Sequence, residues 1–487
     1  MDDRPANATR TMPPDLFPLP LTHFETYMLA DHRPEYPMIF FVRLRFAGRL
    51  DQAKFTLAVN AMLVRHPLLR ATVQNVSGRL CWVSWEGAPQ WTWVSEDRPE
   101  SLMPMPPLDL FALPGLRMQV LRDAANDHLL LEFHHATCDG IAAMQFVEDL
   151  LIAYHAEHGN GAPEATSPRT IDPQRLHQRS RLGMSFWRRL RRIPLAITTA
   201  WGLAEFFTNR PMAFAAPRSP APDEAGPGFA SHGFGRRQLV DLRRVARHLG
   251  VTINDLLVRD LLSTVGVWNR RHQTVAEHEM LRITVPVNLR EPSDARLSAA
   301  NVVSMIFIDR RPGKFASPTA LLRSVVRDTW LVKRFRLGLI FVGVTKWLCL
   351  CPPLLRRMLA GSHCMSTAVL SNLGVQLDKT PLPRHRGRIL AGDVMLDQIE
   401  FFPPLRPFTR VAVGVVTYAD ELNVGLHYDR RLLAVASGDL FLGDLRACID
   451  STAIGDRDAC TLPAKRRDRL RRPRHLQPQP APDPSRL

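Results

Sequence analysis

The stretch of sequence that decides the fold is His134–Gly140, which reads HHATCDG. Residues 129–133 before it are mostly apolar and predict a strand, while the spacing of apolar residues over 141–154 predicts a helix after it. A loop between a strand and a helix holds side chains at the edge of a rigid scaffold, where catalytic and binding residues concentrate. The pattern therefore predicts a functional loop in an α/β protein.

The residue types in this loop suit proton transfer. Side chains alternate between the two faces of a strand, so His134 and His135 point in opposite directions and only one can reach a given cleft. We expect His135 to act as the general base, because an imidazole titrates near neutral pH and can take a proton from a hydroxyl or an amine. We expect a structural role for His134, an ion pair with a cation for Asp139, and a tight exit into the helix at Gly140.

Two other kinds of chemistry can be drawn from the same residues. A metal site made of both histidines and Asp139 would require adjacent strand side chains to converge, so we predict no metal. Cys138 as a nucleophile would need a cationic neighbour to lower its pKa, and the sequence places an acid beside it instead. General-base chemistry is the interpretation that these residues favour.

Helices and strands alternate along both halves of the chain. Helices are expected over residues 21–30, 50–66, 141–154, 236–249 and 252–269, and strands over 38–46, 71–73, 116–122, 129–133, 282–287, 302–309, 368–373, 393–401 and, as a hairpin, 409–417 with 423–428. We predict a flexible N-terminus (1–17), an N-terminal subdomain (18–175), a basic/apolar and Pro-rich connecting segment (176–235), a C-terminal subdomain (236–455) and a basic, Pro-rich disordered tail (456–487).

Composition limits the partners and the compartment. The 487 residues are 45% apolar and 23% charged, a balance typical of folded domains, and the net charge of +16 favours anionic partners. No zinc-finger spacing or aromatic ribonucleoprotein pattern is present, so we predict no nucleic-acid partner. Seven scattered cysteines and the lack of an apolar signal core in residues 1–20 predict a cytoplasmic protein.

The segment Leu337–Leu355 is strongly apolar, but Lys346 interrupts it and Pro352-Pro353 breaks it. A spanning helix needs about 20 uninterrupted apolar residues, so we expect a buried or an interfacial helix instead. Basic residues flank the segment on both sides. Peripheral contact with the inner surface of the membrane is therefore a hypothesis for this chain.

HHATCDG matches the signature HHxxxDG, and the chain resembles the superfamily of condensation domains and chloramphenicol-acetyltransferase-like acyltransferases, in its stand-alone alcohol or lipid O-acyltransferase-like branch. Residues 65–70 (RHPLLR) are similar to the family's RHxxLR element, and residues 286–290 (PVNLR) to its PVNLR element. Residues 371–374 (SNLG) are similar to the Ser-Asn turn of the lipid and alcohol branches. The resemblance covers roughly residues 18–450.

The resemblance implies a fold and a site. Two chloramphenicol-acetyltransferase-like subdomains, each a mixed sheet flanked by helices, would form a V-shaped pseudo-dimer with a tunnel between them. His135 would be the base, and Asp139 would pair with an arginine, for which Arg65 is the first candidate. The residues expected near the tunnel are Asn288, Arg290, Ser371 and Asn372; structural ion pairing is an equal alternative for Arg65 and Arg290.

The resemblance also implies an activity. An acyl group would move from a thioester, acyl-CoA or an acyl-carrier protein, to a hydroxyl or amine of a small molecule or lipid, by direct attack and without a permanently bound cofactor. A carrier-protein-dependent condensation enzyme and a non-catalytic acyl-binding member are the alternatives. The chain lacks the DFGWG element of the plant-type branch and the Pro-Leu-Trp element expected of wax ester and diacylglycerol synthases.

Overall fold

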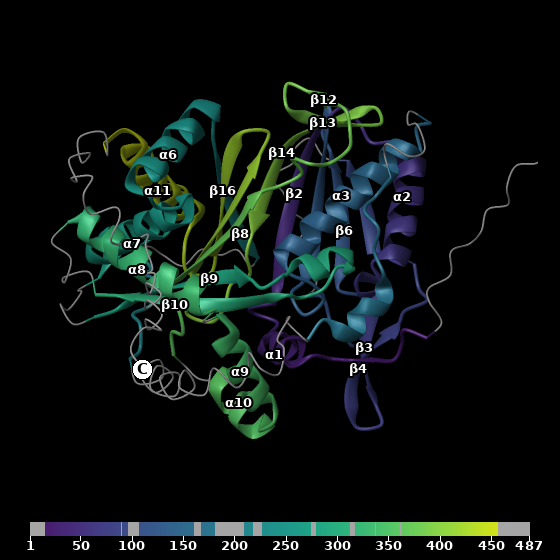
Figure 1. Cartoon of the computed structure of the whole chain (residues 1–487), viewed down its shortest axis with the longest axis horizontal. Helices are drawn as coiled ribbons and strands as arrows, with labels where there is room; N and C mark the ends of the chain where they lie inside the picture. The colour runs from purple at the N-terminus through teal and green to yellow at the C-terminus, as the bar shows by residue number, and fades with distance from the viewer. Residues whose placement is uncertain are drawn as a thin grey trace, which may run out of the picture.

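The computed structural model describes residues 15–88, 90–95, 107–159, 167–180, 209–217, 226–273, 279–311, 317–336, 338–360 and 363–455. These residues form two mixed sheets, of seven and six strands, each flanked by helices, together with a small three-stranded sheet. The two large sheets lie beside each other, with most helices on their outer sides (Figure 1). This is the α/β architecture that the sequence predicts.

The seven-stranded sheet has the order β12-β13-β14-β2-β7-β6-β5. Its strands are β2 (Ile39–Ala47), β5 (Gln90–Ser95), β6 (Leu116–Arg122), β7 (Asn126–His134), β12 (Arg384–His385), β13 (Arg388–Ala391) and β14 (Val394–Phe402). Strand β7 pairs antiparallel with β2 and β6, and its side chains Leu129, Leu131 and Phe133 are fully buried. Helices α2 (Gln52–Arg65) and α3 (Gly140–Ala156) pack side by side on this sheet, so the strand that leads to the motif lies in the centre of the N-terminal core.

The six-stranded sheet has the order β10-β9-β11-β15-β16-β8. Its strands are β8 (Pro227–Phe234), β9 (Leu281–Asn288), β10 (Val303–Arg310), β11 (Ala368–Val375), β15 (Val411–Tyr418) and β16 (Glu421–Asp429). Helices on its outer side are α6 (Arg236–Leu249), α7 (Ile253–His272), α8 (Pro318–Phe335) and α11 (Val435–Gly455). The remaining elements are β1 (Leu19–Pro20), β3 (Ala71–Val76) and β4 (Arg79–Ser84) of the small sheet, α1 (His23–Asp31), α9 (Gly338–Cys349), α10 (Pro352–Leu359) and the short 3₁₀ turns Pro67–Arg70, Pro173–Gln178 and Pro292–Arg296.

Strand β14 joins the two halves, because it lies between β11 and β15 of the C-terminal sheet in sequence but pairs with β2 of the N-terminal sheet. It also packs against β15 and β16, where Gly414 and Gly425 face each other across the two strands. A Cβ atom would lie 2.0 Å from the carbonyl oxygen of Phe401 at Gly414 and 2.5 Å from it at Gly425. Two paired glycines therefore let the backbone of β14 approach the second sheet closely.

The predicted helices correspond to α1, α2, α3, α6 and α7, and the predicted strands to β2, β3, β6, β7, β9, β10, β11, β14, β15 and β16. The cap signals explain two of the helix starts. The Asp51 side chain accepts the Lys54 N–H at 3.0 Å, and the Thr252 hydroxyl accepts the Asp255 N–H at 3.2 Å. The sequence did not predict β1, β4, β5, β8, β12, β13, α8 or α11.

The segment Leu337–Leu355 differs from the single helix that we expected. Its described residues form the helix α9 and the start of α10, joined by residues 350–351. The two helices meet at 116° because Pro352 and Pro353 begin the second one. Most of their side chains are partly or fully exposed, so the alternative of a buried helix is wrong. Within the described ranges no single helix is long and apolar enough to cross a membrane; this bent pair meets the same test by length and composition.

The predicted subdomain boundaries stay a prediction. The boundary predicted at residue 236 does not separate the two large sheets, because β12, β13 and β14 follow it in sequence but belong to the seven-stranded sheet. Residues 1–14 of the predicted N-terminus, most of the connecting segment and the whole predicted tail, 456–487, lie outside the described residues.

Candidate active site

His134, the last residue of β7, has both ring nitrogens engaged. Nδ1 accepts the N–H of Ala136 at 3.1 Å, and Nε2 lies 2.9 Å from Nδ1 of His32. The two imidazole rings stack with centroids 4.8 Å apart. Burial lowers the pKa of His134 well below its ordinary value, so the ring is neutral. These contacts fit the structural role that we expect for His134.

His135 lies just beyond the end of β7, and its Nδ1 has no hydrogen-bond partner among the described residues. Its backbone N–H donates to the carbonyl of Met38 at 2.7 Å, which fixes the turn. Its ring lies edge-on to Phe40 at 5.4 Å and to Phe24 at 6.4 Å, and the residue is partly exposed. Burial lowers the pKa of His135 below its ordinary value, although its own carbonyl and Asp139 oppose the shift. A neutral imidazole in an apolar frame can accept a proton at neutral pH.

Asp139 is buried and ties the motif to the C-terminal half. Its Oδ1 accepts the N–H of Ala142 and so caps α3, while its Oδ2 accepts the N–H of Val302 at 2.8 Å. The same Oδ2 lies 2.8 Å from Nη1 of Arg290, whose Nη2 donates to the carbonyl of Ala300 at 2.9 Å. Both carboxylate oxygens of Asp139 therefore form their contacts with groups of the protein itself. Asp139 therefore anchors the loop, as we expect, but its partner is Arg290.

Arg65, our first candidate for that partner, pairs elsewhere, so this expectation is wrong. Its Nε lies 3.0 Å from Oδ2 of Asp149, which also contacts Nε2 of His66 at 3.1 Å. Asp149 lies ten residues after Asp139 on the same helix, roughly 15 Å farther along the axis. Since α2 packs alongside α3, Arg65 at the end of α2 contacts the middle of α3 and not the beginning of α3.

Asn301 holds the backbone of the motif and was not predicted. Its side-chain amide donates to the carbonyls of His135 at 2.8 Å and Ala136 at 2.9 Å. The side chain is buried, and it also acts on His135 by raising the pKa against the larger effect of burial. One signal was present in the sequence: Asn301 is the only polar residue between Ala299 and Val303, and a buried amide needs partners.

Gly140 is required for packing and not, as we expected, for an unusual backbone conformation. Its φ is not positive, and it starts α3 in ordinary helical geometry. A Cβ atom at this position would lie 2.7 Å from Cδ2 of Leu373 and 3.2 Å from Cζ of Phe401. Leu373 follows Asn372 on β11, so the glycine lets the second half of the chain approach the motif.

The other predicted site residues have varied surroundings. Ser371 is buried in β11, next to Asn372, whose Oδ1 accepts the N–H of Gly374 at 2.8 Å. Asn288 ends β9 and is exposed, and its Oδ1 accepts the N–H of Arg290 at 3.0 Å. Their sequence neighbours Leu373 and Arg290 contact Gly140 and Asp139 of the motif. A role for Ser371, Asn372 and Asn288 in a tunnel remains a prediction.

Cys138 and the metal alternative can be judged from the same geometry. Cys138 is fully buried, and burial raises the pKa of its thiol well above the ordinary value. A protonated, inaccessible thiol is a poor nucleophile. No group of three or more His, Cys, Asp or Glu side chains in the described ranges is arranged to hold a metal ion.

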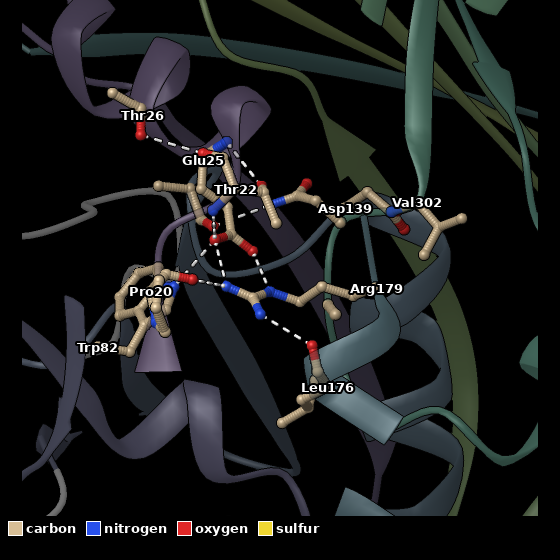
Figure 2. A network of polar contacts seen from close by, with 12 residues as sticks. Pro20, Thr22, Glu25, Thr26, Trp82, Asp139, Leu176, Arg179 and Val302 are labelled. Carbon is tan, nitrogen blue, oxygen red and sulfur yellow. Dashed lines mark hydrogen bonds and ion pairs between the residues drawn. The ribbon is translucent and has the colours of Figure 1, made fainter. Parts of the chain in front are cut away.

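A buried network around Glu25 and Arg179 fixes α1 (Figure 2). This helix carries Phe24, whose ring lies 6.4 Å from that of His135. The guanidinium of Arg179 donates from Nε to Oε1 of Glu25 and from Nη2 to Oε2, both at 2.7 Å. Trp82 Nε1 donates to the same carboxylate at 3.1 Å, and Thr22 completes a capping box with it. The pair is nearly inaccessible, so it holds the start of α1 against the segment around Arg179. Sequence reasoning missed Glu25 and Arg179, since no local pattern connects them.

Comparison with known proteins agrees with this geometry. The family model described as "Condensation domain" matches residues 26–172, and "Wax ester synthase/diacylglycerol acyltransferase catalytic domain" matches residues 126–257. Both matches include the HHATCDG motif. The resemblance to the superfamily of condensation domains and wax ester synthase/diacylglycerol acyltransferases is thus confirmed over residues 26–257.

Relatives over the length of the chain are distant. An uncharacterised protein of Mycobacterium tuberculosis is 25% identical over 439 residues, which are 85% of this chain and 95% of that protein. A second protein of the same organism, named provisionally as a diacylglycerol O-acyltransferase, is 24% identical over 65% of this chain and 67% of its own length.

Solved structures share the fold at low identity. Polyketide synthase associated protein 5 of M. tuberculosis superimposes with a TM-score of 0.60 at 16% identity, covering 90% of this chain and 98% of its own. The starter condensation domain of rhizomide synthetase, solved as a mutant in complex with C8-CoA and Leu-SNAC, gives a TM-score of 0.60 at 14% identity, covering 89% and 94%. The two-sheet fold that the resemblance implies is therefore confirmed.

Proposed function

We propose that this protein is an acyltransferase that moves an acyl group from a thioester, acyl-CoA, to a hydroxyl or amine of a small molecule or lipid. One observation carries the proposal: His135 is the titratable side chain of the motif that is not engaged in structure. His134 is hydrogen bonded at both nitrogens, Asp139 is paired with Arg290, and Cys138 is fully buried. Among the side chains of the motif, His135 combines partial exposure with an Nδ1 that has no hydrogen-bond partner in the described ranges.

The proposed reaction is a direct transfer. The neutral imidazole of His135 takes the proton of the acceptor as its oxygen or nitrogen attacks the thioester carbon. The C–S bond then breaks, the proton passes from His135 to the leaving sulfur, and the enzyme returns to its starting state. The buried, protonated thiol of Cys138 supports a mechanism without an acyl-enzyme. No resident cofactor takes part.

Coenzyme A is the donor carrier that we favour. The net charge of +16 suits its phosphates, and one solved relative of the same fold holds C8-CoA. The free cysteines among the described residues agree with a cytoplasmic site for the reaction, which is part of the proposal. Peripheral contact with a membrane is a separate proposal, since it rests on another surface.

A carrier-protein-dependent condensation enzyme is the second candidate. The match of residues 26–172 to the condensation domain favours it, and an acidic carrier protein would also suit a basic chain. The two candidates separate when the same acyl group is offered on coenzyme A and on a carrier protein. Release of free coenzyme A supports the first candidate, and release from the carrier alone supports the second.

The test of the mechanism is His135→Ala. Octanoyl-CoA is supplied with a panel of alcohols and amines, and free coenzyme A and acylated product are measured by mass spectrometry. We expect turnover to fall by roughly 100- to 10,000-fold, with an unchanged circular dichroism spectrum. Cys138→Ala is the control and should keep its activity. Wild-type turnover in folded His135→Ala would refute the assigned base, and loss of turnover in folded Cys138→Ala would refute direct transfer.

The pH dependence provides a second check on the same residue. A base works when it is unprotonated, so kcat/KM should rise with pH through the lowered pKa of His135. Since that pKa lies below its ordinary value, the rate should already be at its plateau at neutral pH. A rate that is still rising steeply above pH 7.5 would contradict the assignment.

A further inference from the structure

The helices α9 and α10 project from the body of the protein beside α1 (Figure 1). Their inner side is anchored in the core: the ring of Phe341 lies 5.7 Å from Tyr27 and 5.9 Å from Phe307, and Leu355 and Leu359 are buried. A hydrogen bond from the Ser304 hydroxyl to the carbonyl of Gly338 fixes the start of α9. The position of the two helices is therefore well defined.

The outer side of the same two helices is apolar and open. Trp347 is 77% exposed, Leu350 67% and Leu354 51%, and these three side chains come from the end of α9, the bend and the start of α10. Between them lie Cys351, Pro352 and Pro353, which are also exposed. Large apolar side chains gathered at one projecting point mark an interaction site more often than a solvated surface.

The charges around this point have one sign. Lys346, Arg356 and Arg357 are exposed, and none of them forms an ion pair with an acid in the described parts of the chain. The chain holds no Asp or Glu from residue 329 to residue 377. We call the surface made of Trp347, Leu350, Leu354, Lys346, Arg356 and Arg357 the α9–α10 tip.

We propose that the α9–α10 tip docks on an anionic lipid bilayer. Trp347, Leu350 and Leu354 would enter the boundary between headgroups and acyl chains, and the three cations would lie at the lipid phosphates. A Trp at the end of a helix suits this interface, because its ring is apolar and its N–H can reach water. A second copy of this chain is a worse occupant, since a symmetric contact through the tip would bring its unpaired cations together.

The bend between α9 and α10 supports this mode of contact. At 116° between the helices, only the short connection and the turns next to it form the projecting point. The contact is therefore a shallow insertion of a few side chains. The inner side of the tip belongs to the same apolar cluster as Phe24 and Ala136, which lie next to His135. Docking would thus bring the membrane close to α1, which packs against α9 and carries Phe24.

The test is flotation of the full chain with vesicles of phosphatidylcholine alone and with about a third of phosphatidylglycerol added. We expect binding to the anionic vesicles at low salt and weaker binding at high salt. Each cation contributes about fivefold in affinity, so Lys346→Gln with Arg356→Gln and Arg357→Gln should lose roughly 100-fold. The variant Trp347→Ser with Leu350→Ser and Leu354→Ser should lose at least about tenfold.

Two controls keep the result specific. Leu57→Ser with Leu440→Ser and Ile454→Ser changes three equally exposed apolar side chains on other helices and should bind as the wild type does. His135→Ala should also bind normally, because docking does not depend on the proposed chemistry. Failure of the wild type to float with anionic vesicles would overturn the proposal. So would unchanged binding of the tip variants, or a concentration-dependent dimer that only the tip variants lose.

Discussion

Replacing Arg290 by methionine is expected to weaken the junction between the two halves of the protein. The guanidinium of Arg290 lies 2.8 Å from Oδ2 of Asp139, and the two side chains are 10% and 4% exposed. Removal of one partner of a buried pair costs about 3–5 kcal/mol, because the other charge is left buried and uncompensated. The N–H groups of Ala142 and Val302 still donate to Asp139, so we expect the lower end, about 3 kcal/mol.

The companion variant Asp139→Asn removes the charge from the other side. It leaves Arg290 with the carbonyl of Ala300 at 2.9 Å and Oδ1 of Asn288 at 3.5 Å as its described acceptors, and both lie in its own half of the chain. If the two groups act as a pair, the double variant should cost less than the sum of the single ones, by about 1.5–3 kcal/mol. This coupling energy distinguishes a true pair from two independent effects on folding.

The assay is urea-induced unfolding of the wild type, Arg290→Met, Asp139→Asn and the double variant, monitored by circular dichroism and tryptophan fluorescence. A chain of this size need not unfold in a single step, so each transition is fitted separately. Arg271→Met is the matched control: Arg271 pairs with Asp444 at 2.9 Å, but the side chains are 44% and 29% exposed, and we expect a loss below about 1 kcal/mol. Equal losses in Arg290→Met and Arg271→Met, or strictly additive losses in the double variant, would refute the reasoning.

Three further predictions follow from other contacts. Asn301→Ala should lower kcat roughly 10- to 100-fold with little change in KM, because the motif backbone loses two hydrogen bonds; a change in KM alone would contradict a positioning role. Gly414→Ala should destabilise the fold by about 1–3 kcal/mol, because its Cβ would meet the carbonyl of Phe401. The control Gly443→Ala, which has open space around it, should be neutral or stabilising in thermal unfolding. Burial lowers the pKa of His427 to about 4, so the folded protein holds this ring in its neutral form. As the pH falls from 7.5 to 5, the unfolded chain takes up a proton that the folded protein does not, and the free energy of unfolding should fall by about 2 kcal/mol. His427→Gln should show a flatter pH dependence of the urea midpoint, and an equal slope would count against this account.

Local patterns were enough to predict most of the secondary structure and the strand-loop-helix unit that carries HHATCDG. Strand β7 and helix α3 have clear periodicities, and Asp51 and Thr252 mark helix starts by capping chemistry that acts within three residues. The alternation of a strand also separates His134 from His135, and the two histidines do have different surroundings. These features depend on neighbours in sequence, so the sequence contains them directly.

Contacts between distant segments could not be predicted in this way. Arg290 and Asp139 are 151 residues apart, and nothing local favours Arg290 over Arg65 as the partner. The same is true of β14, which pairs with β2 of the first sheet while Gly414 and Gly425 let it approach the second sheet closely. A weak signal for Asn301 existed, but only its burial beside the motif reveals which carbonyls it holds.

The sequence by itself determined the α/β class, the loop HHATCDG and the residue expected to move a proton, because strand alternation, helix periodicity and residue chemistry are local properties. Only the tertiary structure decided that Asp139 pairs with Arg290, that Gly140 is needed for packing, and that the apolar segment around Trp347 faces outward. The physical reason is the same in each case. Burial and ion pairing depend on where whole elements come to lie against one another, and that arrangement is fixed by the packing of both sheets together.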